Sequence, residues 1–146
     1  MAVVLGMNAK LYRNTGTYAS PTWEEIDNVR DVTLSLETGE ADVTTRAAAG
    51  WRQSISTLRD AGLEFELLWD SGGEHFEAVK DAYMAGSNIE FLVLDGDSAT
   101  SGSQGLRAEM AVMSFSRNEA LEEALTVSVS AKPSKSDNAP SWYTTS

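Results

Sequence analysis

The stretch Trp23–Arg46, WEEIDNVRDVTLSLETGEADVTTR, decides the fold of this chain. Polar and apolar residues alternate through its middle, with Val32, Leu34 and Leu36 set between Asp31, Thr33, Ser35 and Glu37. A period of two places the apolar side chains on one face of a strand and the polar ones on the other. The pattern therefore predicts a strand over 28–36 that buries its apolar face and presents a polar face to water.

The alternation ends after this strand. Glu37–Glu40 contains a glycine and no core-forming residue, and the short piece Val43–Thr45 that follows can pair back. We therefore expect an arm, formed by a hairpin or a long loop, from about Glu37 to Gly50.

Composition limits the class of protein. The 146 residues are 42% hydrophobic and 23% charged, which is typical of one soluble domain with a proper core. The 22 carboxylates outnumber the 11 lysines and arginines, giving a net charge of -11. This acidity argues against nucleic-acid binding through phosphate contacts and against docking on an anionic membrane.

The chain has no cysteine, so disulfides and thiolate metal sites are excluded. No signal peptide or membrane-spanning stretch is evident, so the default expectation is a soluble cytoplasmic protein.

Further segments read as strands. Gly62–Trp69 alternates clearly, which predicts that Leu63, Phe65 and Leu67 point inward and that Glu64 and Glu66 point outward. Other expected strands are Ala2–Arg13, Asn88–Asp95, Leu106–Arg117 and Leu121–Ala131, the last two joined by 118–120 into a hairpin. Arg52–Asp60 has too few apolar residues to decide.

One helix is expected from Gly72 to Ala85. Ser71–Glu74 has the form of a capping box, and an apolar stripe follows at helical spacing: Phe76, Val79, Ala82 and Tyr83. Gly86 is a suitable C-cap. Together the elements predict a mainly β fold, an antiparallel sandwich or barrel of about six to eight strands with one flanking helix. This domain spans 1–131, and the polar segment 132–146 is expected to be a C-terminal tail.

Motifs for catalysis are weak. His75 is the only histidine, and a polar or interface role is the expected one for it. The carboxylate pairs, at Glu24-Glu25, Glu64/Glu66 and Glu122-Glu123, are typical of a solvated acidic surface. Asp95–Ser98 lacks the later ligands of a calcium loop and is expected to be a turn. We therefore expect no enzyme, no cofactor and no metal.

Aromatic residues raise a separate question. Trp23, Trp51 and Trp69 adjoin predicted strands, so roles in the core or in subunit contacts come first. Trp142-Tyr143 stands in the polar tail. It indicates either a tail that docks on its own domain or a neighbour, or a merely mobile end.

Four features in order resemble the major tail tube proteins of long-tailed phages, whose fold is related to the type VI secretion tube protein. They are Trp23–Leu34 followed by Glu40–Arg46, the strand Leu63–Trp69 leading into the helix Gly73–Gly86, the strand Ile89–Asp95, and Leu106–Ser116 with Glu119–Ala124 and Thr126–Ser134. These features span nearly the whole chain.

The resemblance implies a structural virion protein. Six copies would form a ring, and stacked rings would make a hollow tube with an acidic lumen that conducts DNA. It implies self-assembly, contacts with tail-tip and tail-terminator proteins, and passage of the tape measure protein and DNA without specific binding. The protein would assemble in the host cytoplasm and reside in the virion tail.

Specific residue roles follow from the same resemblance. Asp31, Thr33, Ser35 and Glu37 are expected to face the lumen. Contacts between rings or subunits are expected for Glu40, Asp42, Thr44, Arg46, Trp51 and Trp142. Two alternatives stay open: the inner tube of a contractile tail or injection system, and a monomeric β-sandwich module that binds a carbohydrate or another ligand.

Overall fold

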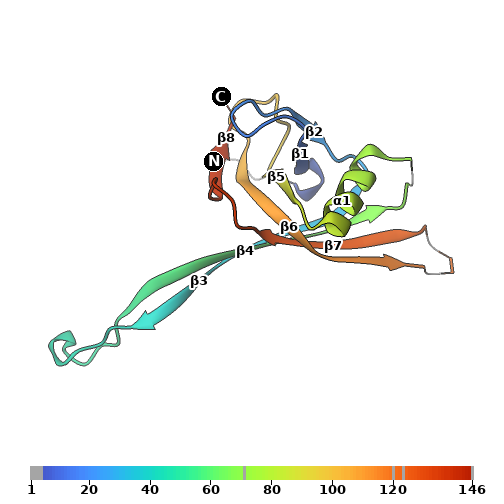
Figure 1. Cartoon of the computed structure of the whole chain (residues 1–146). Helices are drawn as coiled ribbons and strands as arrows, with labels where there is room; N and C mark the ends of the chain where they lie inside the picture. The colour runs from blue at the N-terminus through green and yellow to red at the C-terminus, as the bar shows by residue number, and fades with distance from the viewer. Residues whose placement is uncertain (1–4, 71, 120, 123, 146) are drawn as a thin grey trace.

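The computed structural model describes residues 5–70, 72–119, 121–122 and 124–145 (Figure 1). In chain order its elements are β1 (Lys10–Asn14), β2 (Trp23–Glu25), β3 (Val29–Asp42), β4 (Ser54–Leu68), α1 (Glu74–Ala85), β5 (Asn88–Leu94), β6 (Gln104–Asn118), β7 (Thr126–Pro133) and β8 (Ser141–Thr144). Two short 3-10 turns, Gly6–Asn8 and Arg46–Ala48, complete the described structure. The mainly β fold with one helix is confirmed.

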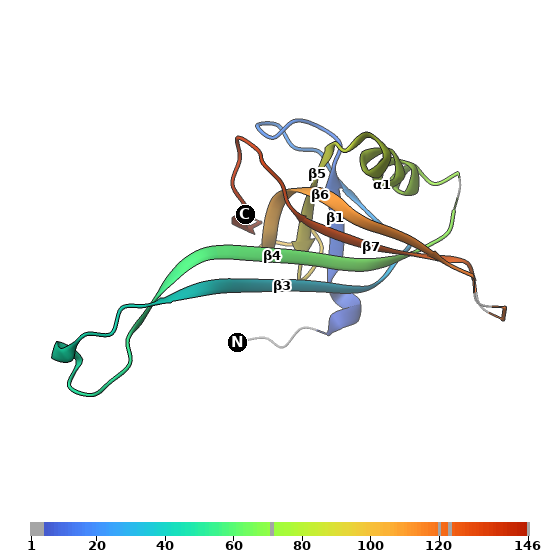
Figure 2. The same ribbon diagram turned by 60° about the horizontal axis from the view of Figure 1, so that its bottom comes forward.

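All strands belong to one antiparallel sheet in the order β2-β1-β5-β6-β7-β4-β3, with β8 also paired to β6. The first half of β6 pairs with β5, and its second half pairs with β7. The register with β7 shifts between Val112 and Ser114, which is the kind of irregularity that bends a strand. The sheet therefore folds over at β6 into two facing layers, as Figures 1 and 2 show.

The hydrophobic core lies between these layers. Leu63, Phe65 and Leu67 of β4 are buried, as the alternation predicts, while Glu64 is exposed. Phe65 meets Phe91 of β5 edge to face, with ring centroids 5.6 Å apart, and so joins the two layers.

The helix α1 packs across the second half of β6. Phe76 lies 4.5 Å from Trp69 and 5.9 Å from Phe115, measured between ring centroids. The predicted capping box is wrong: the N-cap is Gly73, which has no side chain to cap with, and Ser71 lies outside the described residues. The C-cap is confirmed, because Gly86 adopts the left-handed conformation (φ 68°) and donates its N–H to the Ala82 carbonyl.

The arm is a regular two-stranded ribbon rather than a loose loop. β3 continues to Asp42 and pairs with β4 down to Ser54, so the stretch 52–60 that the sequence left undecided is largely strand. Figures 1 and 2 show the ribbon projecting well beyond the two layers. Cross-strand backbone hydrogen bonds hold it without an apolar core, which is why the apolar pattern ended before the strand did.

Three expectations about chain ends and connections need correction. The segment 132–146 is not simply a tail, since β8 pairs with β6 and Tyr143 packs on Trp23 with ring centroids 6.0 Å apart. Of the strand expected over 2–13, residues 2–4 lie outside the described residues, and from residue 5 onward strand structure begins at Lys10, after a 3-10 turn. The loop between β6 and β7 spans 119–125 rather than three residues.

Candidate functional site: a polar sheet face and an arm

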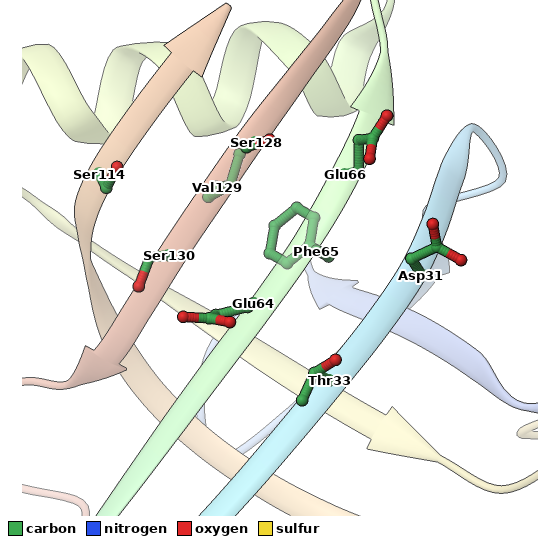
Figure 3. Close-up of a pocket in the computed structure, with 9 residues that line it drawn as sticks. All are labelled: Asp31, Thr33, Glu64, Phe65, Glu66, Ser114, Ser128, Val129 and Ser130. Atoms are coloured by element: carbon green, nitrogen blue, oxygen red, sulfur yellow. The ribbon is translucent and has the colours of Figure 1, made fainter. Parts of the chain in front are cut away.

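One face of the layer that contains β3, β4, β7 and the second half of β6 is lined by small hydroxyls and carboxylates (Figure 3). We call it the polar face; its central residues are Asp31 and Thr33 of β3, Glu64 and Glu66 of β4, Ser114 of β6, and Ser128 and Ser130 of β7. The sheet register sets them side by side, with Glu64 directly between Thr33 and Ser130. Alternation within each strand puts polar groups on this face and core residues behind it.

The four residues predicted to face a lumen all lie on the polar face. Asp31 and Thr33 line its central depression, and Ser35 and Glu37 line its continuation toward the arm. Asp31 sits at a register shift and has a left-handed backbone (φ 46°). Alternation in β4 and β7 indicates that Glu64 and Glu66 share one face of their strand and that Ser128 and Ser130 share one face of theirs. It does not show the register in which the two strands pair, and this register places the four residues on one surface.

Negative charge dominates the polar face. Asp31, Glu37, Glu64 and Glu66 present carboxylates there, and Lys132 Nζ lies 3.4 Å from Asp60 Oδ2 at its edge. A carboxylate-rich surface repels phosphate, so it is unsuited to holding a polyanion.

The expected burial of the opposite face of β3 is only partly correct. Leu34 packs on the core, but Val32 is 38% exposed and Leu36 is 56% exposed. β3 is the last strand of the sheet, and its outer part projects beyond the two layers (Figure 2). An apolar strip at the sheet edge is therefore left uncovered within a single copy.

The arm ends in a loop, 43–53, that its own hydrogen bonds order. Thr44 Oγ1 accepts the N–H of Gln53 at 2.8 Å, and the Val43 N–H donates to the Gln53 carbonyl at 2.9 Å. Asp42 Oδ1 accepts the Thr44 N–H at 2.8 Å. The Thr44 hydroxyl and this backbone N–H lower the pKa of the Asp42 carboxyl below its usual value.

Five of the six predicted contact residues share the arm. Glu40 and Asp42 lie on its ribbon, and Thr44, Arg46 and Trp51 lie in its loop, all exposed. The sixth, Trp142, is on β8 of the body, where it is 58% exposed and donates its indole N–H to Gln104 Oε1 at 3.0 Å. It lines a groove with Leu36 and Arg59 at the base of the arm.

The remaining candidates form no reactive arrangement in the described part of the chain. His75 Nδ1 accepts a bond from Arg13 Nε at 3.4 Å, and Asp97 Oδ1 accepts the Ala99 N–H in a turn, as expected. Among the described residues, no group of three His, Cys, Asp or Glu side chains is placed to hold a metal ion. No helix there is long and apolar enough to cross a membrane.

The structure contains a buried ion pair that the sequence did not predict. Arg107 Nε lies 3.0 Å from Glu90 Oε1, and the same oxygen accepts a bond from Asn14 Nδ2 at 3.0 Å. The Arg107 guanidinium also covers the Tyr18 ring at 3.9 Å and donates to the Tyr18 carbonyl. The pair fastens the 15–22 loop to β5 and β6, so its role is in the body of the fold.

Comparison with known proteins shows which family model and which solved structures the chain matches. A family model described as phage tail tube protein matches residues 8–134. A chain in the virion of a native gene transfer agent particle superposes with a TM-score of 0.74 at 16% identity, covering 97% of this chain and 99% of that one. A chain in the tail of an empty gene transfer agent particle, refined with C6 symmetry, gives 0.75 at 16% identity, covering 99% and 100%. The SPP1 tail tube gives 0.68 at 16% identity, covering 89% and 75%. The search of curated proteins gave no match.

Proposed function

The chain belongs to the phage tail tube protein family, and on that premise we propose that six copies close into a ring whose inner wall is the polar face. Stacked rings then form a hollow tube in the virion tail. The observation that carries this proposal is the alignment of carboxylates and hydroxyls across four adjacent strands, with a packed core directly behind them.

Free sheet edges support ring closure. In the described structure β3 pairs on one side only, with β4, and the end of β6 at 114–118 pairs only with β7. Unpaired backbone N–H and C=O groups along such edges favour pairing with another chain. Joining β3 of one copy to the end of β6 in the next extends the polar face around the ring. It also covers Val32 and Leu36, the apolar side chains that a single copy leaves exposed.

The lumen chemistry suits transport. Asp31, Thr33, Ser35 and Glu37 face the channel in this arrangement, together with the glutamates of β4. Phosphates are repelled by these carboxylates and bind none of them tightly, so DNA can slide through. The tape measure protein passes through the same channel without specific binding.

The arm extends toward a neighbouring ring. Glu40, Asp42, Thr44, Arg46 and Trp51 make contacts between rings, while Trp142, at the base of the arm, contacts an adjacent subunit. At its two ends the tube meets tail-tip and tail-terminator proteins. Assembly takes place in the host cytoplasm.

Electron microscopy of the concentrated, purified protein tests this proposal, with gel filtration across a range of concentrations as its companion. We expect rings or tubes of uniform width and an elution volume that depends on concentration. A protein that elutes as a monomer at every concentration, shows no rings, and binds a carbohydrate through Trp51 or Trp142 would contradict the proposal and favour a ligand-binding module.

A further inference from the structure

The two loops at opposite ends of the elongated molecule carry opposite charge. The arm loop, 43–53, lies at the tip of the β3–β4 ribbon, and the described residues 119, 121–122 and 124–125 of the loop between β6 and β7 lie at the other end (Figures 1 and 2). We call the second one the far loop. The arm loop contains two arginines and no carboxylate, whereas the far loop contains three glutamates and no cation.

The arm loop is a cationic and aromatic tip in an acidic protein. Arg46 and Arg52 are exposed, and neither forms an ion pair with any residue that the structure describes. Trp51, next to Arg52, is 75% exposed. A large aromatic beside unpaired arginines is the composition typical of the centre of a protein interface.

The far loop has the complementary composition. Leu121 is fully exposed, and the exposed residues Glu119 and Glu122 flank it. Arg117 lies 3.6 Å from Glu119, which neutralises part of the charge at the base of this loop but leaves Glu122 to solvent. Each loop thus presents a strongly exposed apolar side chain, Trp51 or Leu121, beside charges of a single sign.

We propose that the arm loop of one copy docks on the far loop of a copy in the next ring. This inference rests on the proposed function and specifies the receptor of the arm. Trp51 packs against Leu121, and Arg46 and Arg52 pair with Glu119 and Glu122. Contact between two arm loops would bring arginines of like charge together, so charge favours the head-to-tail arrangement of arm loop on far loop. A head-to-tail stack has a free arm loop at one end and a free far loop at the other, so the tube can lengthen without limit.

Charge reversal tests the pairing. Arg46→Glu with Arg52→Glu should leave rings intact but shorten the mean tube length at least tenfold at low salt, and Glu119→Lys with Glu122→Lys should do the same. Combining all four substitutions should restore tubes. The matched control, Lys80→Glu with Lys135→Glu, changes the net charge as much as the arginine reversal, lies outside both loops, and should leave tube length unchanged.

The outcomes separate this inference from the proposed function. Wild-type protein that forms neither rings nor tubes would overturn both. Rings that stack normally after either reversal, or a fourfold variant that stays as single rings, would overturn only the docking of the arm loop on the far loop.

Cross-linking provides a second measurement, since the chain has no cysteine of its own. Ala47→Cys and Ala124→Cys, introduced together, keep Trp51 and Leu121 in place. A short bis-maleimide should then link copies into a ladder of trimers and longer chains on a denaturing gel. Each single variant should give no species beyond a dimer. A double variant that also stops at dimers would contradict head-to-tail docking.

Discussion

The two halves of β4 differ sharply although they form one continuous strand. From Ser54 to Asp60 every residue is exposed, including Leu58 at 86%, whereas Leu63, Phe65 and Leu67 are almost fully buried. Both halves pair with β3 through the same backbone hydrogen bonds. The difference is that the second half has another layer of sheet packed on it and the first half has only solvent.

This contrast separates folding from assembly. Burial of apolar area in the body is the main source of its stability. The arm adds backbone hydrogen bonds, whose net contribution is small in water. Its apolar and charged side chains are exposed, and we propose that a neighbouring copy contacts them. Substitutions in the body should therefore change the free energy of unfolding, and substitutions in the arm should change assembly.

Shortening the arm should abolish tube formation while leaving the fold intact. The variant removes residues 41–55 and joins Glu40 to its cross-strand partner Ser56 through an Asn-Gly turn, which preserves the register. We expect folded monomers or rings with a melting temperature close to that of the wild type, and no tubes by electron microscopy. Tubes of normal length would show that the arm does not connect rings.

Two leucines on β4 allow a matched comparison of stability. Leu63→Ala should lower the free energy of unfolding by about 2–5 kcal/mol, because it leaves a cavity in a closed core. Leu58→Ala removes the same atoms from an exposed site and should change the free energy of unfolding by no more than about 0.5 kcal/mol. Denaturant unfolding of the unassembled protein measures both. Equal losses would mean that the arm has a buried partner within one copy.

The buried ion pair should behave as part of the body. Arg107→Ala leaves the Glu90 carboxylate, whose side chain is only 6% exposed, without its charged partner. Losing one member of such a pair costs about 3–5 kcal/mol, and we expect a loss near the lower limit because Asn14 still bonds to Glu90. Glu90→Gln combined with Arg107→Met should recover part of the loss. A single variant as stable as the wild type would show that the 15–22 loop needs no such fastening.

A small pH effect should be confined to the arm. The pKa of Asp42 is lowered by the Thr44 hydroxyl and N–H, so its stabilisation of the arm loop is present above the unfolded pKa and is lost as pH falls through the folded pKa. NMR titration should give a midpoint below that of an ordinary aspartate. Thr44→Val should move the midpoint part of the way back, whereas Thr38→Val, elsewhere on β3, should leave it unchanged. An unshifted wild-type midpoint would contradict this account of the loop.

Sequence alternation predicted the body well because its strands have one face in a core. For Gly62–Trp69 the strand, its end near Leu68 and the side-chain directions were predicted correctly, although β4 begins earlier, at Ser54. Alternation does not indicate a strand where neither face of that strand is buried. The ribbon from Glu37 to Asp42 and its partner from Ser54 to Asp60 are held by backbone pairing, and β8 is a strand inside a polar segment.

The candidate site was predicted strand by strand but not as a surface. Alternation placed Asp31, Thr33, Ser35 and Glu37 on one face, and the structure confirms that they share it. Pairing between segments distant in sequence set Glu64 beside Ser130, and no local pattern encodes that register. The expected burial of Leu36 was wrong because alternation reveals an apolar face without revealing whether the same copy covers it.

A structure of the assembled tube by electron cryo-microscopy tests the central claim most directly. We expect Asp31, Thr33, Ser35 and Glu37 of every copy to line the channel beside Glu64 and Glu66, with Val32 and Leu36 covered by the neighbouring copy. A tube in which the polar face lies on the outer surface, or is buried between subunits away from the channel, would contradict the claim.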